Sequence, residues 1–546
     1  MLPVLARSLG LLAVVCAIHV FAHDPAPTAP AAAVALDPGL GRLHHPVSTR
    51  NTQAQAYFDQ GLKLVFAFNH EAAIKSFARA AELDPDLAMA HWGIALALGP
   101  NINHGMDATA HKAAYEALQR AIALEPKASP AERSYIVALS RRYSADANAD
   151  QGPLQLAYKD TMKDLVRRYP RDDDAAVLYA ESLMDLHPWK FWAPDGTPAD
   201  GTREIVAVLE RVLARAPDHI GANHYYIHAV EASPQPGKAL AAARRLPNLA
   251  PSAGHLVHMP AHTYIRTGNY LEAARANVAA VLADERLAQS GADTFYMRGY
   301  YGHNLHFLAI ANAFAGKSRD AIAAANKLYE FEAPRIKEVP ELDGFLFTPS
   351  LLLVEFGRWD DVLALPEPAF EAPISAALWH FARTLALAGK GRMDEAQAER
   401  QRFLDAAAAL PKTQEYGNND AAGVMAVARP YLDGRLALMS GNNAGAIASL
   451  RLAAAAEDAL AYDEPPAWYL PSRDALGVAL MRECDYPAAE QVYRDELAIH
   501  PESGRALFGL RAALTAQKRD REAAALQKSF ERAWREADVK LEPGAM

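Results

Sequence analysis

One spacing of small, aromatic and proline residues recurs along this chain and limits it to a stack of paired helices. It is clearest in the segment AQAYFDQGLKLVFAFNHEAAIKSFARAAELDP, which begins at Ala54 and carries Gly61, Ala73, Phe77, Ala80 and Pro85. Small residues on two successive helices let the helices touch closely, and the proline ends the second helix. The segment therefore predicts one tightly packed helix pair.

This spacing resembles the tetratricopeptide repeat, a helix-pair motif of about 34 residues. The match returns near the C-terminus with Gly477, Ala489, Tyr493 and Pro501. The resemblance implies an all-α fold, a right-handed superhelical solenoid of about twelve tetratricopeptide-like helix pairs, running from Ala54 to Trp534. In such a solenoid the first helix of each pair lines a concave wall that usually binds a peptide or protein.

The array is expected to have three parts. Residues 54–217 form N-terminal repeats with loop insertions, 218–335 form central repeats rich in histidine, and 336–546 form C-terminal repeats. Two insertions, Gly99–Ala110 and His187–Gly201, lengthen turns on the same edge of the solenoid. Insertions on one rim are often functional.

Histidines and tryptophans mark these turns. His70, His104 and His187 lie in or beside them, with Trp189 and Trp192 in the second insertion. They are either polar loop residues with aromatic anchors that hold the insertions down, or parts of a lid that excludes water from one end of the groove.

The N-terminus predicts export. Residues 1–22 combine Arg7, an apolar run from Leu9 to Ala17, and Val20-Phe21-Ala22 as a cleavage site, which is the pattern of a secretory signal peptide. Residues 23–53 are an Ala/Pro-rich linker and lead-in to the repeats. We expect a periplasmic or secreted protein without a membrane span. A lipoprotein anchored through Cys16 is the weaker alternative, because Ala13-Val14-Val15 is a poor lipobox.

Composition excludes several classes. With 51% hydrophobic and 22% charged residues, the chain is too apolar to be disordered. Its 55 Lys and Arg against 65 Asp and Glu give a net charge of −10, which argues against a nucleic-acid partner. Two cysteines make no disulfide framework, and Cys484 remains after cleavage. Motifs for serine hydrolases, nucleotide binding and thiol redox chemistry are absent.

Histidines cluster in the central repeats at equivalent repeat positions. Within a helix, spacings of three, four and seven residues place side chains on one face. Three successive first helices therefore present imidazoles and the Glu231 carboxylate to one patch of the concave wall. The seven histidines are His224, His228, His255, His258, His262, His303 and His306. Pro260 lies between His258 and His262 and predicts an irregular helix there.

This patch predicts a metal site. Imidazole is the commonest metal ligand at neutral pH, and three or four nitrogens suit Zn or Cu, whereas fewer nitrogens plus Glu231 suit Fe. Two alternatives stay open, namely recognition of an acidic or aromatic ligand by the imidazoles and a structural hydrogen-bond network. If a metal is bound, Glu231 is either a ligand or the general base for a metal-bound water.

Two functions follow from these features. The first is an exported scaffold that binds a protein, peptide or small-molecule ligand in the groove with a transition metal at the histidine site. The second is a metal-dependent enzyme, a hydrolase or an oxidoreductase, that uses the same histidines. Open metal coordination would favour the enzyme.

Overall fold

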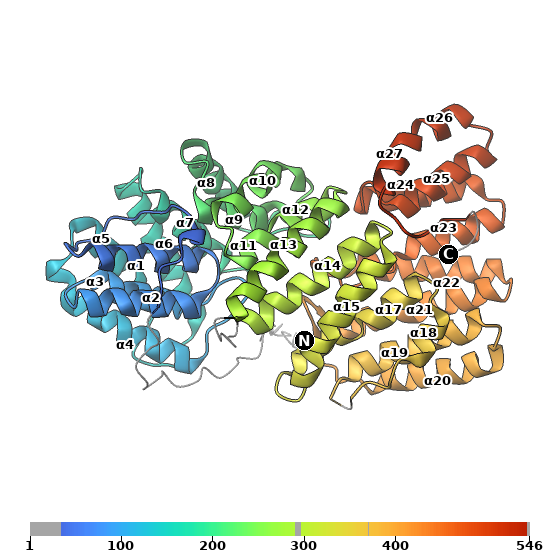
Figure 1. The fold of residues 1–546 in the computed structure, drawn as a ribbon, viewed down its shortest axis with the longest axis horizontal. Helices are drawn as coiled ribbons and strands as arrows, with labels where there is room; N and C mark the ends of the chain where they lie inside the picture. Colours follow the sequence, from blue (N-terminus) through green and yellow to red (C-terminus); the bar gives the residue numbers. More distant parts are fainter. Residues whose placement is uncertain (1–33, 290–295, 370, 543–546) are drawn as a thin grey trace, which may run out of the picture.

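The structure is a computed structural model that describes residues 34–289, 296–369 and 371–542 (Figure 1). The expected signal peptide, residues 1–22 with Cys16, lies outside the described residues. The described part is helical almost throughout, and a two-stranded hairpin pairs β1 (Glu415–Tyr416) with β2 (Asn419–Asp420). The all-α class is confirmed.

Helices pair in chain order, as the repeat pattern predicts. In the N-terminal part the pairs are α1 (Thr52–Phe66) with α2 (His70–Leu83), α3 (Ala88–Ala97) with α4 (Ala108–Leu124), α5 (Pro130–Leu139) with α6 (Gln151–Arg168), and α7 (Asp173–Met184) with α8 (Thr202–Arg215). Short helical turns lie at Pro38–Leu40 (η1) and Glu125–Lys127 (η2).

The central pairs carry the histidines. They are α9 (Ile220–Glu231) with α10 (Leu240–Leu249), the split helix α11 (Gly254–His258) and α12 (Pro260–Arg266) with α13 (Tyr270–Ala288), and α14 (Gly302–Phe314) with α15 (Ser318–Glu332). Short turns are η3 (Pro236–Ala239), the wider π-type turn η4 (Met297–Tyr301) that leads into α14, and η5 (Ala333–Arg335).

The C-terminal part completes the solenoid. Its helices are α16 (Asp343–Leu346) and α17 (Thr348–Glu355) with α18 (Trp359–Ala364), α19 (Pro373–Gly389) with α20 (Met393–Ala409), α21 (Ala421–Met439) with α22 (Asn443–Asp458), α23 (Ser472–Arg482) with α24 (Tyr486–Ile499), and α25 (Gly504–Ala516) with α26 (Asp520–Ala525) and α27 (Gln527–Ala533), after the turn η6 (Pro340–Leu342). Twelve pairs are thus present in the described residues.

Glycines of the repeat motif face its aromatic residues. A Cβ added to Gly61 on α1 would lie 2.6 Å from the ring of Phe77 on α2, and one added to Gly93 on α3 would lie 2.5 Å from the same ring. Tyr493 fills the same place between Gly477 and Gly509 at the other end of the chain. The aromatic ring of each second helix therefore packs between two first helices that must carry glycine.

The superhelix turns back on itself, so that its first pair lies against its fifth. The carbonyl oxygen of Phe66, at the end of α1, accepts a hydrogen bond of 2.7 Å from His224 on α9. A Cβ at Gly221 on α9 would lie 2.6 Å from the Phe66 ring. In Figure 1 the blue α1 and the green α9 lie in the same half of the molecule. This contact covers the inner face of the central repeats.

The C-terminal part covers the same repeats from the other side. The hydroxyl of Tyr462, in the segment between α22 and α23, donates a 3.2 Å hydrogen bond to Glu231 at the end of α9. The Tyr270 hydroxyl donates to the carbonyl of Pro501 at 2.9 Å. The inner faces of α9, α11 and α12 are therefore enclosed between two distant parts of the chain.

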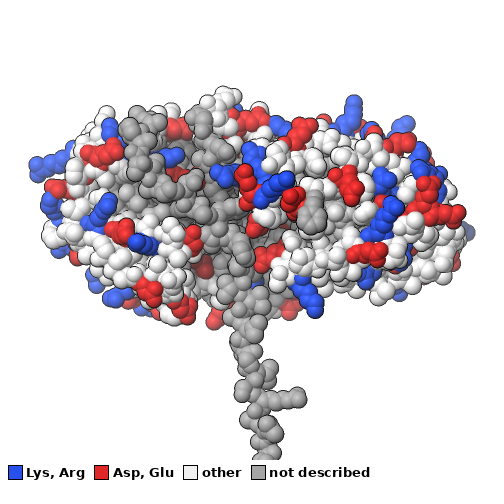
Figure 2. Space-filling model, turned by 90° about the horizontal axis from the view of Figure 1, so that it is seen from below, with Lys and Arg blue, Asp and Glu red and all other residues white. Residues whose placement is uncertain are grey.

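Charged side chains of both signs are interspersed over the face in Figure 2. The described residues visible there present no continuous basic field of the kind that a phosphate backbone requires. Among the residues placed in the structure, no helix combines the length and the apolar character that a bilayer span needs.

Candidate metal centre

The histidines lie on three helical segments. His224 and His228 lie one turn apart on α9, and His303 lies near the start of α14. His258 ends α11, and Pro260 takes the first position of α12, where its missing N–H disrupts little. Met259 keeps helical dihedral angles, so the chain continues as a helix across the break, and His262 lies beside His258. The irregular helix expected at Pro260 is confirmed, and the shared face is kept.

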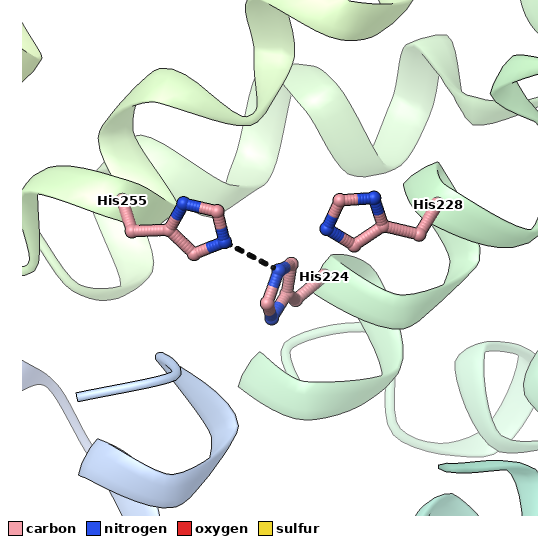
Figure 3. A group of neighbouring side chains, drawn as sticks. All are labelled: His224, His228 and His255. Carbon is pink, nitrogen blue, oxygen red and sulfur yellow. Dashed lines mark hydrogen bonds between the residues drawn. The ribbon is translucent and has the colours of Figure 1, made fainter. Parts of the chain in front are cut away.

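Three of the rings form what we call the first triad, His224, His228 and His255. One nitrogen from each ring lies within 4.8 Å of the others. Figure 3 shows the three imidazoles converging from two segments of chain. The Nε2 atoms of His224 and His255 lie 3.1 Å apart, and all three side chains are at most 2% exposed.

The second triad is His258, His262 and His303. Its nitrogens meet the same 4.8 Å limit. Nε2 of His258 lies 2.8 Å from Nε2 of His262 and 3.1 Å from Nε2 of His303. His258 and His262 are buried, and His303 is half-buried. The two triads are neighbours, because the ring centroids of His228 and His262 lie 5.6 Å apart.

In four of the six rings, Nδ1 lies beside a hydrogen-bond acceptor. The Phe66 carbonyl and Asn277 are two of these acceptors, and Glu231 is the acceptor beside the other two rings. His224 donates to the Phe66 carbonyl at 2.7 Å, and His258 donates to Oδ1 of Asn277 at 2.7 Å. The amide of Asn277 is itself fixed, because its Nδ2 donates to the carbonyl of Ala273. An imidazole that uses its Nδ1 hydrogen in this way presents a lone pair at Nε2, the atom that binds metals.

Glu231 links the two triads. Its Oε1 lies 2.7 Å from Nδ1 of His228 in the first triad, and its Oε2 lies 2.5 Å from Nδ1 of His262 in the second. Both carboxylate oxygens therefore face ring nitrogens that must carry hydrogen. This geometry is that of a carboxylate that orients metal ligands.

Two Nε2 atoms face each other in the second triad. Nε2 of His258 and Nε2 of His262 approach to 2.8 Å, while Nδ1 of His258 contacts Asn277 and Nδ1 of His262 contacts Glu231. Nε2 of His228, in the first triad, is buried and has no hydrogen-bond partner among the described residues. The Nε2 atoms of each triad are close enough together to share one ion.

Burial keeps most of these rings neutral. Burial and the neighbouring imidazoles lower the pKa values of His224, His255, His258 and His303 well below the ordinary 6.5. Burial would also lower the pKa of His262, but the adjacent Glu231 carboxylate raises it above 6.5. Burial opposes ionisation of Glu231, yet His262 and His228 hold its pKa well below its usual range. Neutral imidazole is the form that binds metal.

Aromatic side chains wall the two triads. The Phe68 ring stacks on His228 and on His255, with interplanar angles of 18° and 24°. Phe307 contacts His258 at a centroid distance of 5.0 Å and His262 at 5.1 Å. The centre therefore lies in a mostly apolar enclosure and not on an open groove wall.

Both insertions reach this enclosure. Trp189 meets His228 edge-on at 5.3 Å, and the indole of Trp192 donates to the carbonyl of Ala229 at 2.8 Å. In the other insertion, Asn103 donates to the hydroxyl of Tyr300, whose ring lies 4.4 Å from that of His255. The second insertion thus contacts a ring of the first triad directly, and the first insertion contacts it through Tyr300.

The remaining predicted histidines lie elsewhere. His306 is a turn further along α14, where its ring contacts Phe345 and Tyr469, and burial lowers its pKa to about 3. His70 lies behind Phe68 and reaches Asn101 at 3.4 Å. His187 is exposed. The structure therefore brings together six of the seven predicted metal ligands.

Several residues of the centre carry no signal in the sequence. The Phe66 carbonyl, Asn277 and Tyr462 come from three different repeats, and each contacts a ligand or Glu231 through a hydrogen bond. A backbone carbonyl or a single amide in a helix is not distinguishable in a sequence. In the sequence, the repeat register of the His-rich helices is the signal that indicates this site.

A third group of potential metal donors comprises His45, Asp172 and Asp174. These donors already bond to one another and to neighbours. His45 meets Asp174 at 2.7 Å, His219 meets the other oxygen of Asp174 at 3.1 Å, and Tyr135 donates to Asp172. This group is an ion-pair network that fastens the lead-in segment to the repeats.

Comparison with known structures finds other helical proteins at low similarity. Yeast Tom70 is 13% identical, with a TM-score of 0.33, over 88% of this chain and 100% of that chain. The human IFIT1 dimer with m7Gppp-AAAA is 13% identical, with a TM-score of 0.31, over 90% and 91%. The APC/C hetero-tetramer Cut9-Hcn1 is 12% identical, with a TM-score of 0.30, over 88% and 76%. No protein-family model and no curated protein matches the chain. The tetratricopeptide architecture therefore rests on the helix pairs and their packing.

Proposed function

We propose that this protein is an exported tetratricopeptide scaffold that holds transition-metal ions in two adjacent tris-histidine sites. The groove outside the enclosure would receive a protein, peptide or small-molecule partner. Zn, Cu and Fe are the candidate ions at the level of ligand type. Export is proposed from the N-terminal sequence pattern.

One observation carries the metal proposal. The Nε2 atoms of His258 and His262 face each other at 2.8 Å while Asn277 and Glu231 engage their Nδ1 atoms. A proton between them would satisfy that pair alone. A metal ion satisfies His303 as well, and a second ion accounts for the buried Nε2 of His228.

A structural hydrogen-bond network explains this less well. Such a network pairs each acceptor with a donor, whereas the buried Nε2 of His228 has no hydrogen-bond partner among the described residues. Leaving a buried polar atom without a partner costs about 1–3 kcal/mol. The contacts of Glu231, Asn277 and the Phe66 carbonyl with the second nitrogen of each ring are those that metal-binding histidines usually make.

Metal-dependent catalysis is the second candidate function. Each triad supplies three protein ligands, the number that leaves a coordination position open for water or substrate. Glu231 would then orient ligands and not act as the base, since both of its oxygens contact imidazoles.

Elemental analysis of untagged protein, as purified and after dialysis against Zn, Cu and Fe salts, tests the proposal. We expect bound metal that a chelator removes and that returns on dialysis. Protein that is metal-free and takes up none of the three ions contradicts the metal proposal. N-terminal sequencing of the mature chain tests export, and a start at His23 is expected.

A further inference from the structure

We propose that the two triads hold a pair of copper ions that, as Cu(I), bind one molecule of dioxygen. This inference rests on the proposed metal centre and adds the identity of the ions and of their small-molecule ligand. It follows from the ligand types, the charge of the enclosure and the spacing of the triads.

The ligand types narrow the choice of metal. The six converging donors are imidazole nitrogens, without a carboxylate or thiolate among them. Mg, Ca and Mn favour oxygen ligands, and non-haem iron sites of the facial type add a carboxylate. Glu231 is occupied by His228 and His262, and Cys484 is exposed. Imidazole alone suits zinc, copper and nickel, and nickel, like zinc, binds as a divalent ion.

The charge of the bound ions then distinguishes copper from zinc. A coordinated imidazole brings no charge, five of the six rings are buried, and Glu231 is the carboxylate that contacts them among the described residues. Two Zn²⁺ ions would bring four positive charges into this apolar enclosure, whereas two Cu(I) ions bring two. Burying uncompensated charge is costly, and the cost rises steeply with charge. The enclosure therefore favours the monovalent pair.

The spacing places the two ions next to each other. His228 and His262 approach to 5.6 Å between ring centroids, and His255 and His258 approach to 6.0 Å. Each of these pairs joins one triad to the other. A small ligand held by one ion is therefore within reach of its neighbour.

The walls select the ligand by size and polarity. Phe68, Phe307 and Trp189 contact the ligand rings, and the rings of the first triad are at most 2% exposed. A peptide or sugar has no access to such a centre, whereas dioxygen is small and apolar. Dioxygen chemistry is also typical of protein-bound copper.

The binding step balances without any outside reactant. Each Cu(I) gives one electron, and the two electrons reduce dioxygen to the peroxide level with its O–O bond intact. Both ions become Cu(II), and each gains a bond to oxygen. No proton is taken up, and the net charge of the buried centre is unchanged.

Anaerobic reconstitution tests the inference. Full-length apo protein is loaded with Cu(I) under nitrogen, washed free of excess metal, and mixed with oxygenated buffer in an oxygen electrode and a spectrophotometer. We expect two Cu(I) per chain, uptake of about one dioxygen for each copper pair, and a new near-ultraviolet absorption band. Cu(I) that binds in pairs without oxygen uptake overturns the inference and leaves the metal proposal standing. Binding of Zn²⁺ but not Cu(I) also overturns it.

Variants tie the oxygen chemistry to the pair. H228A, in the first triad, should bind one copper, and its oxygen uptake should fall at least tenfold. H303A, in the second triad, should give the same result, and His303 is half-buried, so its loss should disturb the fold little. H306A is the matched control, because His306 lies outside both triads, and it should keep full uptake. Full uptake in H228A and H303A overturns the inference. Circular dichroism confirms the helicity of each variant.

Discussion

His258 and His262 face each other with their Nε2 atoms 2.8 Å apart, in the interior of the central repeats. Nδ1 of His258 contacts Asn277 and Nδ1 of His262 contacts Glu231, and these contacts orient the two rings. The repeats thus hold two imidazole nitrogens together at a distance that a shared cation, as proposed above, would stabilise.

Replacing Glu231 by Gln should weaken binding at both triads. Glutamine accepts through one oxygen only, so one of the two Nδ1 contacts is lost and the charge that supports both is removed. Loss of such an outer contact typically costs 10- to 100-fold in metal affinity. Competition with a chromophoric chelator measures both affinities.

The matched control for this change is Glu210→Gln, at an exposed position on α8. It should bind metal as the unmodified protein does. If Glu231→Gln weakens neither ion, or if both variants weaken binding equally, Glu231 does not link the two triads.

Replacing Gly61 by Ala should destabilise the first repeats. The new methyl would lie 2.6 Å from the Phe77 ring, which is held on its other side by Gly93. Overpacking of this kind costs about 1–3 kcal/mol. Guanidinium unfolding followed by circular dichroism measures the loss. Gly105→Ala is the control, since nothing lies within 4 Å of its added Cβ, and equal loss in both variants would contradict the packing account.

The His45–Asp174 contact predicts a pH-dependent contribution to stability. Burial lowers the pKa of His45, but Asp174 raises it, and the result lies above 6.5. The protonated His45 therefore stabilises the fold below pH 6.5, and this stabilisation is lost as the pH rises through the raised pKa. Burial raises the pKa of Asp174, but His219 and His45 hold it well below 3.8, so its contribution is present above pH 3.8 and is lost in acid.

The substitution Asp174→Asn should therefore lower the free energy of unfolding most between pH 3.8 and pH 6.5. Near pH 5 we expect a loss of roughly 2–3 kcal/mol in the free energy of unfolding, the value of hydrogen bonds to charged groups, and a smaller loss at pH 8.5. Asp172 and Asp59 also act on His45 and stay in place in this variant. The exposed Asp200→Asn serves as control. A loss that is the same at both pH values would show that the contact is not ionic.

The repeat fold was predictable because its determinants are local. Gly61, Phe77 and Pro85 act within one helix pair, and the same spacing returns at Gly477 and Tyr493. The helices of the His-rich repeats were predictable for the same reason. The structure confirms the all-α solenoid and its pairing.

The partition into two triads was not predictable, because it depends on contacts between distant repeats. Phe66 approaches His224 only because the superhelix turns back on itself, and Tyr462 reaches Glu231 from the C-terminal part. His306 occupies a motif position equivalent to that of His258, yet Phe345 and Tyr469 surround it instead. Repeat register predicts a face of a helix but not what the rest of the chain places against that face.

Metal stoichiometry tests the central claim most directly. Equilibrium dialysis with mass-spectrometric metal analysis should find two ions per chain in the unmodified protein, one in H228A and one in H258A, because each change breaks one triad. H306A should keep both ions. A protein that binds one ion or none, or single changes in either triad that leave the stoichiometry untouched, would contradict the account of two adjacent tris-histidine sites.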